Sequence, residues 1–301
     1  MPDPAELEIL AIVADLREQL RERYGWTHLD VSIDPAPAMT RLTGTVAVPR
    51  IAELLAAAIR ERRPEFAVTL TLAPMPALAW HALADDLVEL WAEHPSQPKR
   101  ALATELLVAD GPLARLAEDG LATLVRARDG TVGWIDGGLG PAVAARPLTA
   151  PALPERPGPA VCEAARAYLG VRYQLGGTTH ARIDCSGLVA RAYTAALGLV
   201  LPRNSNDQLA IADGGLVCAR AEGDPGDLLF LRSRATGRTH VGVLTEAGTI
   251  LHASRSRDAV LDERAVEFEA DAEWLRRVPL GRLVDWAQGE VGQDSVRLPR
   301  R

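Results

Sequence analysis

Cysteine and lysine are scarce in this chain of 301 residues. The three cysteines, Cys162, Cys185 and Cys218, form an odd and sparse set. They imply no disulfide framework, and such a set suits a reducing compartment. Lys99 is the only lysine, so nearly all of the 33 basic residues are arginines. The formal net charge of −7 argues against nucleic acid as the main partner, because phosphate binding requires clustered Lys and Arg.

Long apolar runs and a leader segment are also missing from the sequence. No run is long enough to cross a bilayer, so we expect no membrane span. The first eight residues lack a basic stretch followed by an uninterrupted apolar core, which argues against a secretory signal. We therefore expect a cytoplasmic protein, with the cell envelope as the alternative. The length predicts two or three domains, and 48% apolar with 24% charged residues is typical of globular proteins.

The first 95 residues predict a small α/β sandwich of α-β-β-α-β order, similar in element order to BON-type adaptor domains. Its expected elements are a helix over 5–23, strands over 29–33 and 42–48, a helix over 51–60 and a strand over 66–72. Apolar residues at helical spacing, including Leu83, Leu87 and Leu90, predict a further helix over 78–94. Nothing in this region indicates catalysis.

Residues 96–145 predict a small β module. Short alternating segments are joined by tight turns, and Asp129-Gly130 is a strong hairpin signal. The run from Arg126 to Ile135 resembles the C-terminal half of a bacterial SH3-like barrel. We expect residues 146–159, rich in Pro and Ala, to form a linker between this module and the next domain. Residues 289–301 are expected to be a frayed tail.

Cys185 is the strongest candidate for chemistry in the chain. It follows Asp184, a good helix N-cap residue, and precedes apolar residues at helical spacing from Leu188 to Ala196. The first turn of a helix presents unpaired amides and the positive end of the helix dipole, which favour a thiolate over a thiol. The alternative is a small buried hydrophobic side chain, as most isolated cysteines are. Cys162 and Cys218 fit that alternative better.

Two histidines lie downstream on a predicted hairpin. Residues 239–244 and 250–254 form its arms, and the arms carry His240 and His252. A cysteine nucleophile needs a base to hold its proton, and the base needs a third polar group to fix its tautomer. His240 can be that base and His252 the orienting group. The alternative is that both are core or surface histidines.

An ordered series of motifs extends from about residue 160 to residue 285. After a helix over 160–169, the series runs through Tyr173-Gln174-Leu175-Gly176-Gly177, Asp184-Cys185-Ser186-Gly187, Leu201-Pro202-Arg203, Gln208, Pro225-Gly226-Asp227, His240-Val241-Gly242 and His252-Ala253-Ser254. This series closely resembles the NlpC-type family of papain-like cell-wall cysteine peptidases. The resemblance covers residues 160–288 and implies an α+β domain, in which a helix bearing the cysteine packs against a small antiparallel sheet bearing the histidines.

The resemblance also implies residue roles and a substrate. It matches Cys185 to the nucleophile, His240 to the base and His252 to the third polar residue. Tyr173 matches a tyrosine that helps to polarise the scissile carbonyl. The implied reaction is hydrolysis of the bond between γ-D-glutamyl and a diamino acid, either diaminopimelate or lysine, in murein stem peptides.

The second implied feature is recognition of a free amine. In the subgroup that acts on free murein peptides, the equivalents of Asp184 and Ser186 hold the α-amine of an N-terminal L-Ala. A carboxylate beside a hydroxyl suits an ammonium group. The alternative is that Asp184 only caps the helix, and both roles can coexist. We expect neither a cofactor nor a metal, because His180 has no ligand spacing around it and the Gly176-Gly177 loop lacks a P-loop lysine.

The sequence therefore predicts a cysteine peptidase that recycles short murein peptides with a free N-terminal L-Ala. One alternative is an envelope endopeptidase that acts on intact cell wall. Another is a non-catalytic wall-binding protein that keeps the peptidase fold, and a related amidase or acyl-transfer reaction is a third. The oligomeric state does not follow from the sequence.

Overall fold

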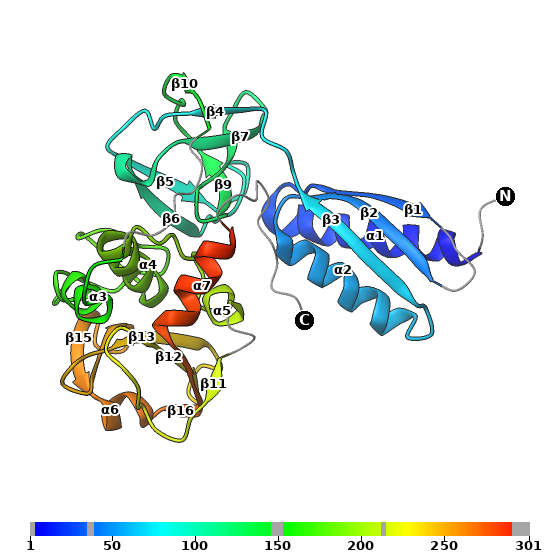
Figure 1. Cartoon of the computed structure of the whole chain (residues 1–301). Coiled ribbons are helices and arrows are strands. Elements are labelled where there is room, and N and C mark those ends of the chain that lie inside the picture. Colours follow the sequence, from blue (N-terminus) through cyan, green and yellow to red (C-terminus); the bar gives the residue numbers. More distant parts are fainter. Residues whose placement is uncertain (1–3, 35–38, 146–152, 212–214, 291–301) are drawn as a thin grey trace. The chain divides into compact units, whose positions relative to one another are not determined.

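The computed structural model describes residues 4–34, 39–145, 153–211 and 215–290. Contacts divide the chain into two units (Figure 1). The first comprises Met1–Ala101, Asp110–Ala127 and Val132–Ala145, and the second comprises Leu102–Ala109, Arg128–Thr131 and Arg146–Arg301. Half of the predicted linker over 146–159 and nearly all of the predicted tail over 289–301 lie outside the described residues. No described helix is both long and apolar enough to cross a membrane.

The first unit begins with the expected α-β-β-α-β order. Its elements are α1 (Pro4–Tyr24), β1 (Leu29–Asp34), β2 (Thr40–Val46), α2 (Pro49–Arg62) and β3 (Val68–Pro74). The strand order is β1-β2-β3, with β1 antiparallel and β3 parallel to β2. Leucine, isoleucine and valine side chains from both helices and the sheet share one core. The predicted helices and strands of this region are confirmed.

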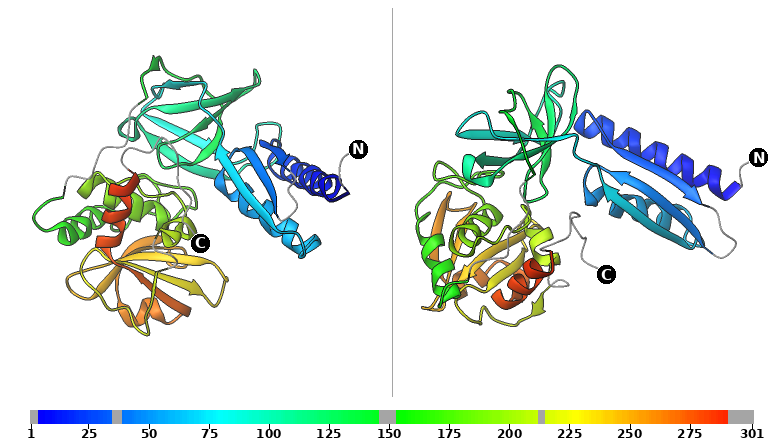
Figure 2. Two further views of the ribbon diagram at one scale, coloured as in Figure 1. Left: turned by 45° about the vertical axis from the view of Figure 1, so that its right-hand side comes forward. Right: turned by 45° about the horizontal axis from the view of Figure 1, so that its top comes forward.

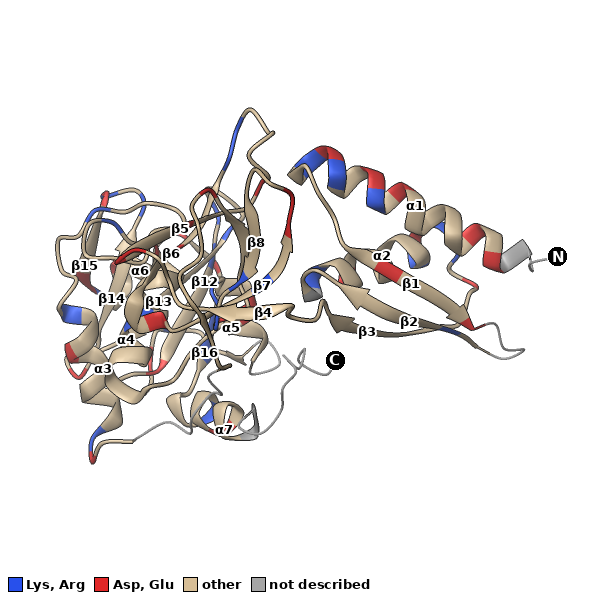
Figure 3. Cartoon of the chain, turned by 90° about the horizontal axis from the view of Figure 1, so that it is seen from above, with Lys and Arg blue, Asp and Glu red and all other residues tan. Residues whose placement is uncertain are grey.

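Charges on α1 follow the electrostatics of a helix. Glu6 lies in its first turn, and Arg21 and Arg23 lie in its last turn, where each sign complements the helix dipole. Figure 3 shows acidic residues along the whole of α1 and basic residues only toward its C-terminal end, where acidic residues lie among them. The solvent-facing side of this helix therefore offers no basic stripe.

A second sheet of the first unit replaces the helix expected over 78–94. Within the unit its strand order is β10-β4-β7-β8-β9-β5. These strands are β4 (Ala79–His81), β5 (Leu87–Trp91), β7 (Leu113–Glu118), β8 (Thr123–Arg126), β9 (Val132–Ile135) and β10 (Ala142–Val143). The helix prediction was wrong because ladder partners far away in the sequence override the local spacing: Trp80 pairs with Ala114, and Trp91 pairs with Trp134.

The hairpin expected around Asp129-Gly130 is present. Strands β8 and β9 pair antiparallel, with Arg126 opposite Val132, and Gly130 has the positive φ of 84° that the turn requires. The described strands form an open sheet, with no closed barrel among them. This sheet begins at Ala79, well before the predicted module over 96–145. The SH3-like assignment stays a prediction.

The second unit has the α+β character expected of the catalytic domain. Six antiparallel strands are ordered β11-β16-β12-β13-β14-β15, and both views in Figure 2 show helices alongside them. The strands are β11 (Leu216–Val217), β12 (Leu228–Ser233), β13 (Thr239–Leu244), β14 (Thr249–Ser254), β15 (Ala259–Arg264) and β16 (Ala272–Val278). The helices are α3 (Pro157–Arg166), α4 (Cys185–Leu197), α5 (Ser205–Ala210), α6 (Ala265–Glu269) and α7 (Leu280–Glu290). The unit also contains β6 (Leu102–Leu107).

Helix α4 is the central helix of this unit. It packs against α3, β13 and β14. Leu188, Val189 and Tyr193 lie in the main core of the unit and are fully buried. The helix ends at Leu197 because Gly198 adopts the left-handed conformation, with φ 68°, which costs a glycine little. The packing of α4 on the sheet fixes the position of its first residue, Cys185.

Candidate active site

The start of α4 is built by Asp184. Its backbone is extended, and its Oδ1 accepts a hydrogen bond from the Gly187 amide at 2.7 Å. This is the N-cap geometry that satisfies one of the free amides of the first turn. Cys185 is then the first helical residue, as predicted, and only 8% of its surface is exposed.

The environment of the Cys185 sulfur differs from the expectation for a helix start. Burial, and to a lesser degree the Asp184 carboxylate, raises the pKa of the thiol to about 12. The backbone amides of Val241 and Ser186 and the charge of Arg203 act in the opposite direction. The amides at the helix start thus stabilise the anion as predicted, but desolvation outweighs them. Burial therefore favours the thiol over the thiolate at Cys185.

Tyr173 lies on the segment that leads to the nucleophile. It forms a parallel bridge with Ile183, two residues before Cys185, and its side chain is half-buried. Burial raises the pKa of its phenol well above the usual range, and the charges of Cys185 and Asp184 raise it further. A phenol that stays protonated at neutral pH is a hydrogen-bond donor.

The two predicted imidazoles lie side by side on the hairpin arms. Nε2 of His240 on β13 is 2.8 Å from Nδ1 of His252 on β14. The ring centroids are 5.0 Å apart with an interplanar angle of 80°, and the Phe268 ring packs against both. His240 immediately precedes Val241, the residue whose amide acts on the Cys185 sulfur. With Nε2 directed at His252, the second ring nitrogen of His240 is left for another partner.

Both rings are neutral in the folded protein. Burial, together with the neighbouring His252, lowers the pKa of His240 to about 3, and burial lowers the pKa of His252 to about 4. Nε2 of His252 lies 3.1 Å from Oε1 of Glu263 on β15, although the angle is too poor for a hydrogen bond. Burial also raises the pKa of the Glu263 carboxyl. Burial therefore favours the neutral form of both rings, and the Glu263 carboxyl is the acidic group beside the outer nitrogen of His252.

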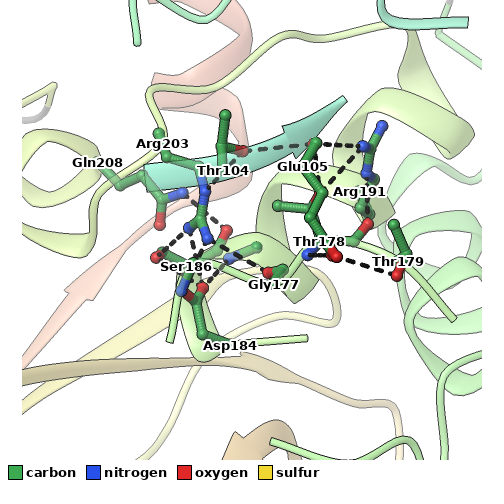
Figure 4. Close-up of polar contacts among 12 residues, drawn as sticks. Thr104, Glu105, Gly177, Thr178, Thr179, Asp184, Ser186, Arg191, Arg203 and Gln208 are labelled. Carbon is green, nitrogen blue, oxygen red and sulfur yellow. Dashed lines mark hydrogen bonds and ion pairs between the residues drawn. The ribbon is translucent and has the colours of Figure 1, made fainter. Parts of the chain in front are cut away.

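The carboxylate of Asp184, the residue before Cys185, has partners for all of its lone pairs. Asp184 accepts five hydrogen bonds: Oδ1 from Gly187, Ser186 and Arg203, and Oδ2 from Gly176 and Arg203. The Asp184 and Arg203 side chains are each 4% exposed, and their two contacts are 2.9 Å and 2.7 Å long (Figure 4). Burial works against the charge of Arg203, yet Asp184 holds the guanidinium pKa above its usual value.

This pairing bears on the predicted amine recognition. A carboxylate offers about four lone-pair sites, and protein donors already take all of them on Asp184. The Ser186 hydroxyl donates to Asp184 at 3.2 Å and accepts from Arg203 at 3.1 Å. The helix-capping role of Asp184 is confirmed. Binding of a substrate amine by these two residues stays a prediction, and it would have to displace an internal donor.

Sequence reasoning assigned no role to two residues of this cluster. Arg203 stood in the motif series, but nothing in the sequence revealed that it pairs with Asp184. Gln208, fully buried on α5, donates to the Pro202 carbonyl at 2.8 Å and to the Ser186 carbonyl at 3.1 Å, and so ties α5 to the start of α4. Among the described residues, no group of three or more His, Cys, Asp or Glu side chains is arranged to hold a metal ion.

Comparison with known proteins identifies this part of the chain. The model of the NlpC/P60 family matches residues 170–271, which include Tyr173, Cys185, His240 and His252. A murein DD-endopeptidase/murein LD-carboxypeptidase, MepS, of Escherichia coli K12 is 40% identical over 117 residues, covering 39% of this chain and 57% of the relative. A γ-DL-glutamyl hydrolase of Bacillus subtilis is 37% identical over 110 residues, covering 36% of this chain and 26% of the relative.

Solved structures give matches of the same kind. The peptidoglycan hydrolase RipB of Mycobacterium tuberculosis is 28% identical and covers 42% of this chain and 68% of its own, with a TM-score of 0.31. An NlpC/P60 family protein of Bacillus cereus is 20% identical and covers 66% of this chain and 62% of its own, with a TM-score of 0.35. The chain spans little more than half the length of the Escherichia coli relative and about a quarter of the Bacillus subtilis one.

Proposed function

Residues 170–271 belong to the NlpC/P60 family, and from this premise we propose that the chain is a cysteine peptidase that hydrolyses murein stem peptides. The observation that carries the proposal is the buried thiol of Cys185 at a capped helix start, beside the hairpin of β13 and β14 that carries the His240–His252 pair. A nucleophile, a base and an orienting group are the minimum set for acyl transfer through a covalent intermediate.

The proposed mechanism begins with neutral groups. His240, with Nε2 held by His252, takes the Cys185 proton on its other ring nitrogen as the sulfur attacks the scissile carbonyl. The Tyr173 phenol donates to the developing oxyanion. The imidazolium then gives its proton to the departing amine, and the C–N bond breaks to leave a thioester on Cys185. His240 next takes a proton from water, whose oxygen attacks the thioester, and returns it to the leaving sulfur.

We further propose that the bond cut is the one between γ-D-glutamyl and a diamino acid. The name of the Bacillus subtilis relative, a γ-DL-glutamyl hydrolase, supports this choice. The name of the Escherichia coli relative supports a different bond, in the DD cross-link. Short peptides with a free N-terminal L-Ala, and a cytoplasmic location, remain proposals from the sequence. The envelope endopeptidase and the non-catalytic wall-binding protein are the competing outcomes.

The test is digestion of defined substrates by the purified full chain, with products identified by mass spectrometry. The substrates are L-Ala-γ-D-Glu-diaminopimelate, its lysine analogue, a DD-cross-linked peptide dimer and intact sacculi. We expect release of L-Ala-D-Glu from a tripeptide, and a fall in rate of roughly 10⁴-fold or more in Cys185→Ala. Cys218→Ala is the matched control, and we expect it to keep full activity, because Cys218 is part-buried against a different apolar cluster from that of Cys185.

Other outcomes would overturn specific parts of the proposal. If only the dimer is cleaved, the proposed scissile bond is the cross-link and not the γ-D-glutamyl bond. If only sacculi are cleaved, the envelope endopeptidase is favoured. A thiol that reacts with iodoacetamide in a protein that cleaves none of the substrates would favour the binding protein.

A further inference from the structure

Strand β6 carries a buried carboxylate that the proposed mechanism does not use. Glu105 is 1% exposed, and it lies far upstream of residues 170–271, which match the family. Burying a carboxylate is strongly unfavourable unless partners compensate its charge and fill its lone pairs. The partners of Glu105 therefore indicate which part of the structure this side chain holds in place.

All of the described side-chain partners of Glu105 lie in the loop that leads to the nucleophile. Oε2 accepts from the Thr178 amide at 3.0 Å and from the Thr179 hydroxyl at 3.2 Å, and Oε1 accepts from Nε of Arg182 at 2.6 Å. Figure 4 shows Glu105 directed at this loop from β6. One side chain thus holds three positions of the segment that ends at Asp184.

Other groups of β6 contact the same loop and Arg203. The Glu105 carbonyl accepts from the Thr178 hydroxyl at 2.6 Å, and the Thr104 hydroxyl accepts from Nε of Arg203 at 3.1 Å. At Gly176, which has a φ of 87°, a Cβ atom would lie 2.2 Å from the Leu102 carbonyl oxygen. Only a glycine lets the loop approach the strand this closely.

The loop that β6 contacts is hydrogen-bonded in turn to residues next to the reacting groups. The Gly177 carbonyl accepts from the Asp184 amide at 3.1 Å and from Arg203 at 3.2 Å. At the other end of the loop, Tyr173 bridges to Ile183. The loop therefore sets where the Tyr173 phenol stands relative to the Cys185 sulfur.

We propose that Glu105 and Thr104 are positioning residues for the reaction, which hold the 176–184 loop so that Tyr173 and Cys185 keep the geometry of acyl transfer. This inference rests on the proposed peptidase function. It makes β6 part of the catalytic machinery, although β6 lies outside the family match. A small displacement of a reacting group can cost as much as about 100-fold in rate without removing any group that touches the substrate.

The test compares Glu105→Gln with Glu267→Gln in the full chain. The control removes the same charge from an exposed ion pair with Arg264 in the same unit. Steady-state kinetics on the cleaved tripeptide, the rate of Cys185 alkylation and the thermal midpoint are measured for each protein. For Glu105→Gln we expect kcat to fall at least about ten-fold with KM within about two-fold, and alkylation of Cys185 to change in rate. Glu267→Gln matches the parent protein in every readout.

The outcomes separate this inference from the proposed function. A folded Glu105→Gln protein with the parent kcat and only a lower midpoint would show that Glu105 merely stabilises the fold. A parent protein that cleaves nothing would instead remove the proposed function. If Glu105→Gln does not fold, Thr104→Val takes its place, because it removes only one hydroxyl, which accepts from Arg203 and donates to the Glu105 carbonyl. We expect a fall in kcat of about two- to five-fold, and an unchanged kcat would refute the inference.

Discussion

The second unit buries two kinds of polar cluster near Cys185, and the clusters differ in how their charged groups are paired. In the carboxylate cluster, formed by Asp184, Arg203 and Glu105, each carboxylate is paired with a guanidinium: Asp184 with Arg203, and Glu105 with Arg182. The imidazole pair, His240 and His252, lies against Phe268 and is neutral. A buried charge with every lone pair filled holds its surroundings rigid, whereas a buried neutral base can accept and return a proton.

The comparison bears on the Cys185 thiol, which borders on both clusters. Asp184 precedes it in the chain and caps its helix, and the amide of Val241, next to His240, acts on its sulfur. Burial raises the pKa of the thiol and lowers the pKa of both imidazoles, so it favours the neutral form of each group. In the proposed reaction, the proton therefore passes from sulfur to imidazole only as the sulfur attacks the substrate carbonyl.

Replacing Arg203 should disrupt the carboxylate cluster and have the largest effect on the stability of the protein. Arg203→Met leaves the Asp184 carboxylate buried without its counter-charge, and we expect a loss of about 3–5 kcal/mol in the free energy of unfolding. Urea unfolding at pH 7.5 measures the loss. Arg264→Met, at an exposed ion pair, is the control and should change stability by no more than about 0.5 kcal/mol. A loss below about 1 kcal/mol in Arg203→Met would mean that the pair contributes little.

Lowering the pH should act on the imidazole pair. The unfolded chain binds protons on both rings below about pH 6.5, whereas the folded protein excludes them until about pH 4 and 3. The unfolded state therefore binds more protons in this window, so the stability from these groups is full above pH 6.5 and falls as the pH drops toward 3. At pH 5.0 we expect a cost on the order of 2 kcal/mol for each ring.

Urea unfolding at pH 7.5 and pH 5.0 tests this dependence. The double variant His240→Gln/His252→Gln should lose much less stability between the two values than the parent chain. His180→Gln is the control, because His180 is exposed and should leave the parent dependence unchanged. An equal loss in the double variant and the parent would show that other groups carry the pH dependence.

Ser186→Ala should have the smallest effect and sharpens the role of the carboxylate cluster. The hydroxyl contributes one hydrogen bond to Asp184 and accepts one from Arg203, so we expect about 1 kcal/mol of lost stability and kcat and KM within about two-fold. Recognition of a substrate amine predicts a different result. In that case KM would rise for a peptide with a free N-terminal L-Ala and stay unchanged for its N-acetylated form.

The local sequence pattern predicted most of the elements whose contacts are with residues nearby in the sequence. The hairpin arms at His240 and His252, the helix after Asp184 and the first five elements of the chain all follow from spacing and cap chemistry. The helix expected around Leu87 failed because the partners of β4 and β5 come from β7 and β9, far along the chain. Apolar spacing in a short segment fits either structure until those partners are known.

The site shows the same division. The types and order of the residues identified Cys185, His240 and Tyr173 as candidates, since each belongs to a recognisable motif. The ion pair between Asp184 and Arg203 was not visible, because a salt bridge across 19 positions leaves no local signal. The expectation that the helix start lowers the pKa of Cys185 failed for a similar reason. The sequence indicates where the helix begins, but the burial that raises the pKa depends on the assembled core.

The path of the chain between the two units has a practical consequence. Leu102–Ala109 and Arg128–Thr131 belong to the second unit, although the residues between and before them belong to the first. An expression fragment trimmed to begin at Pro157 would contain every residue of the proposed triad but would omit β6. The amide of Thr178 and the guanidinium of Arg182 would lose their acceptor. Exchange of modules between homologous genes meets the same obstacle, because no single cut separates the second unit from the first.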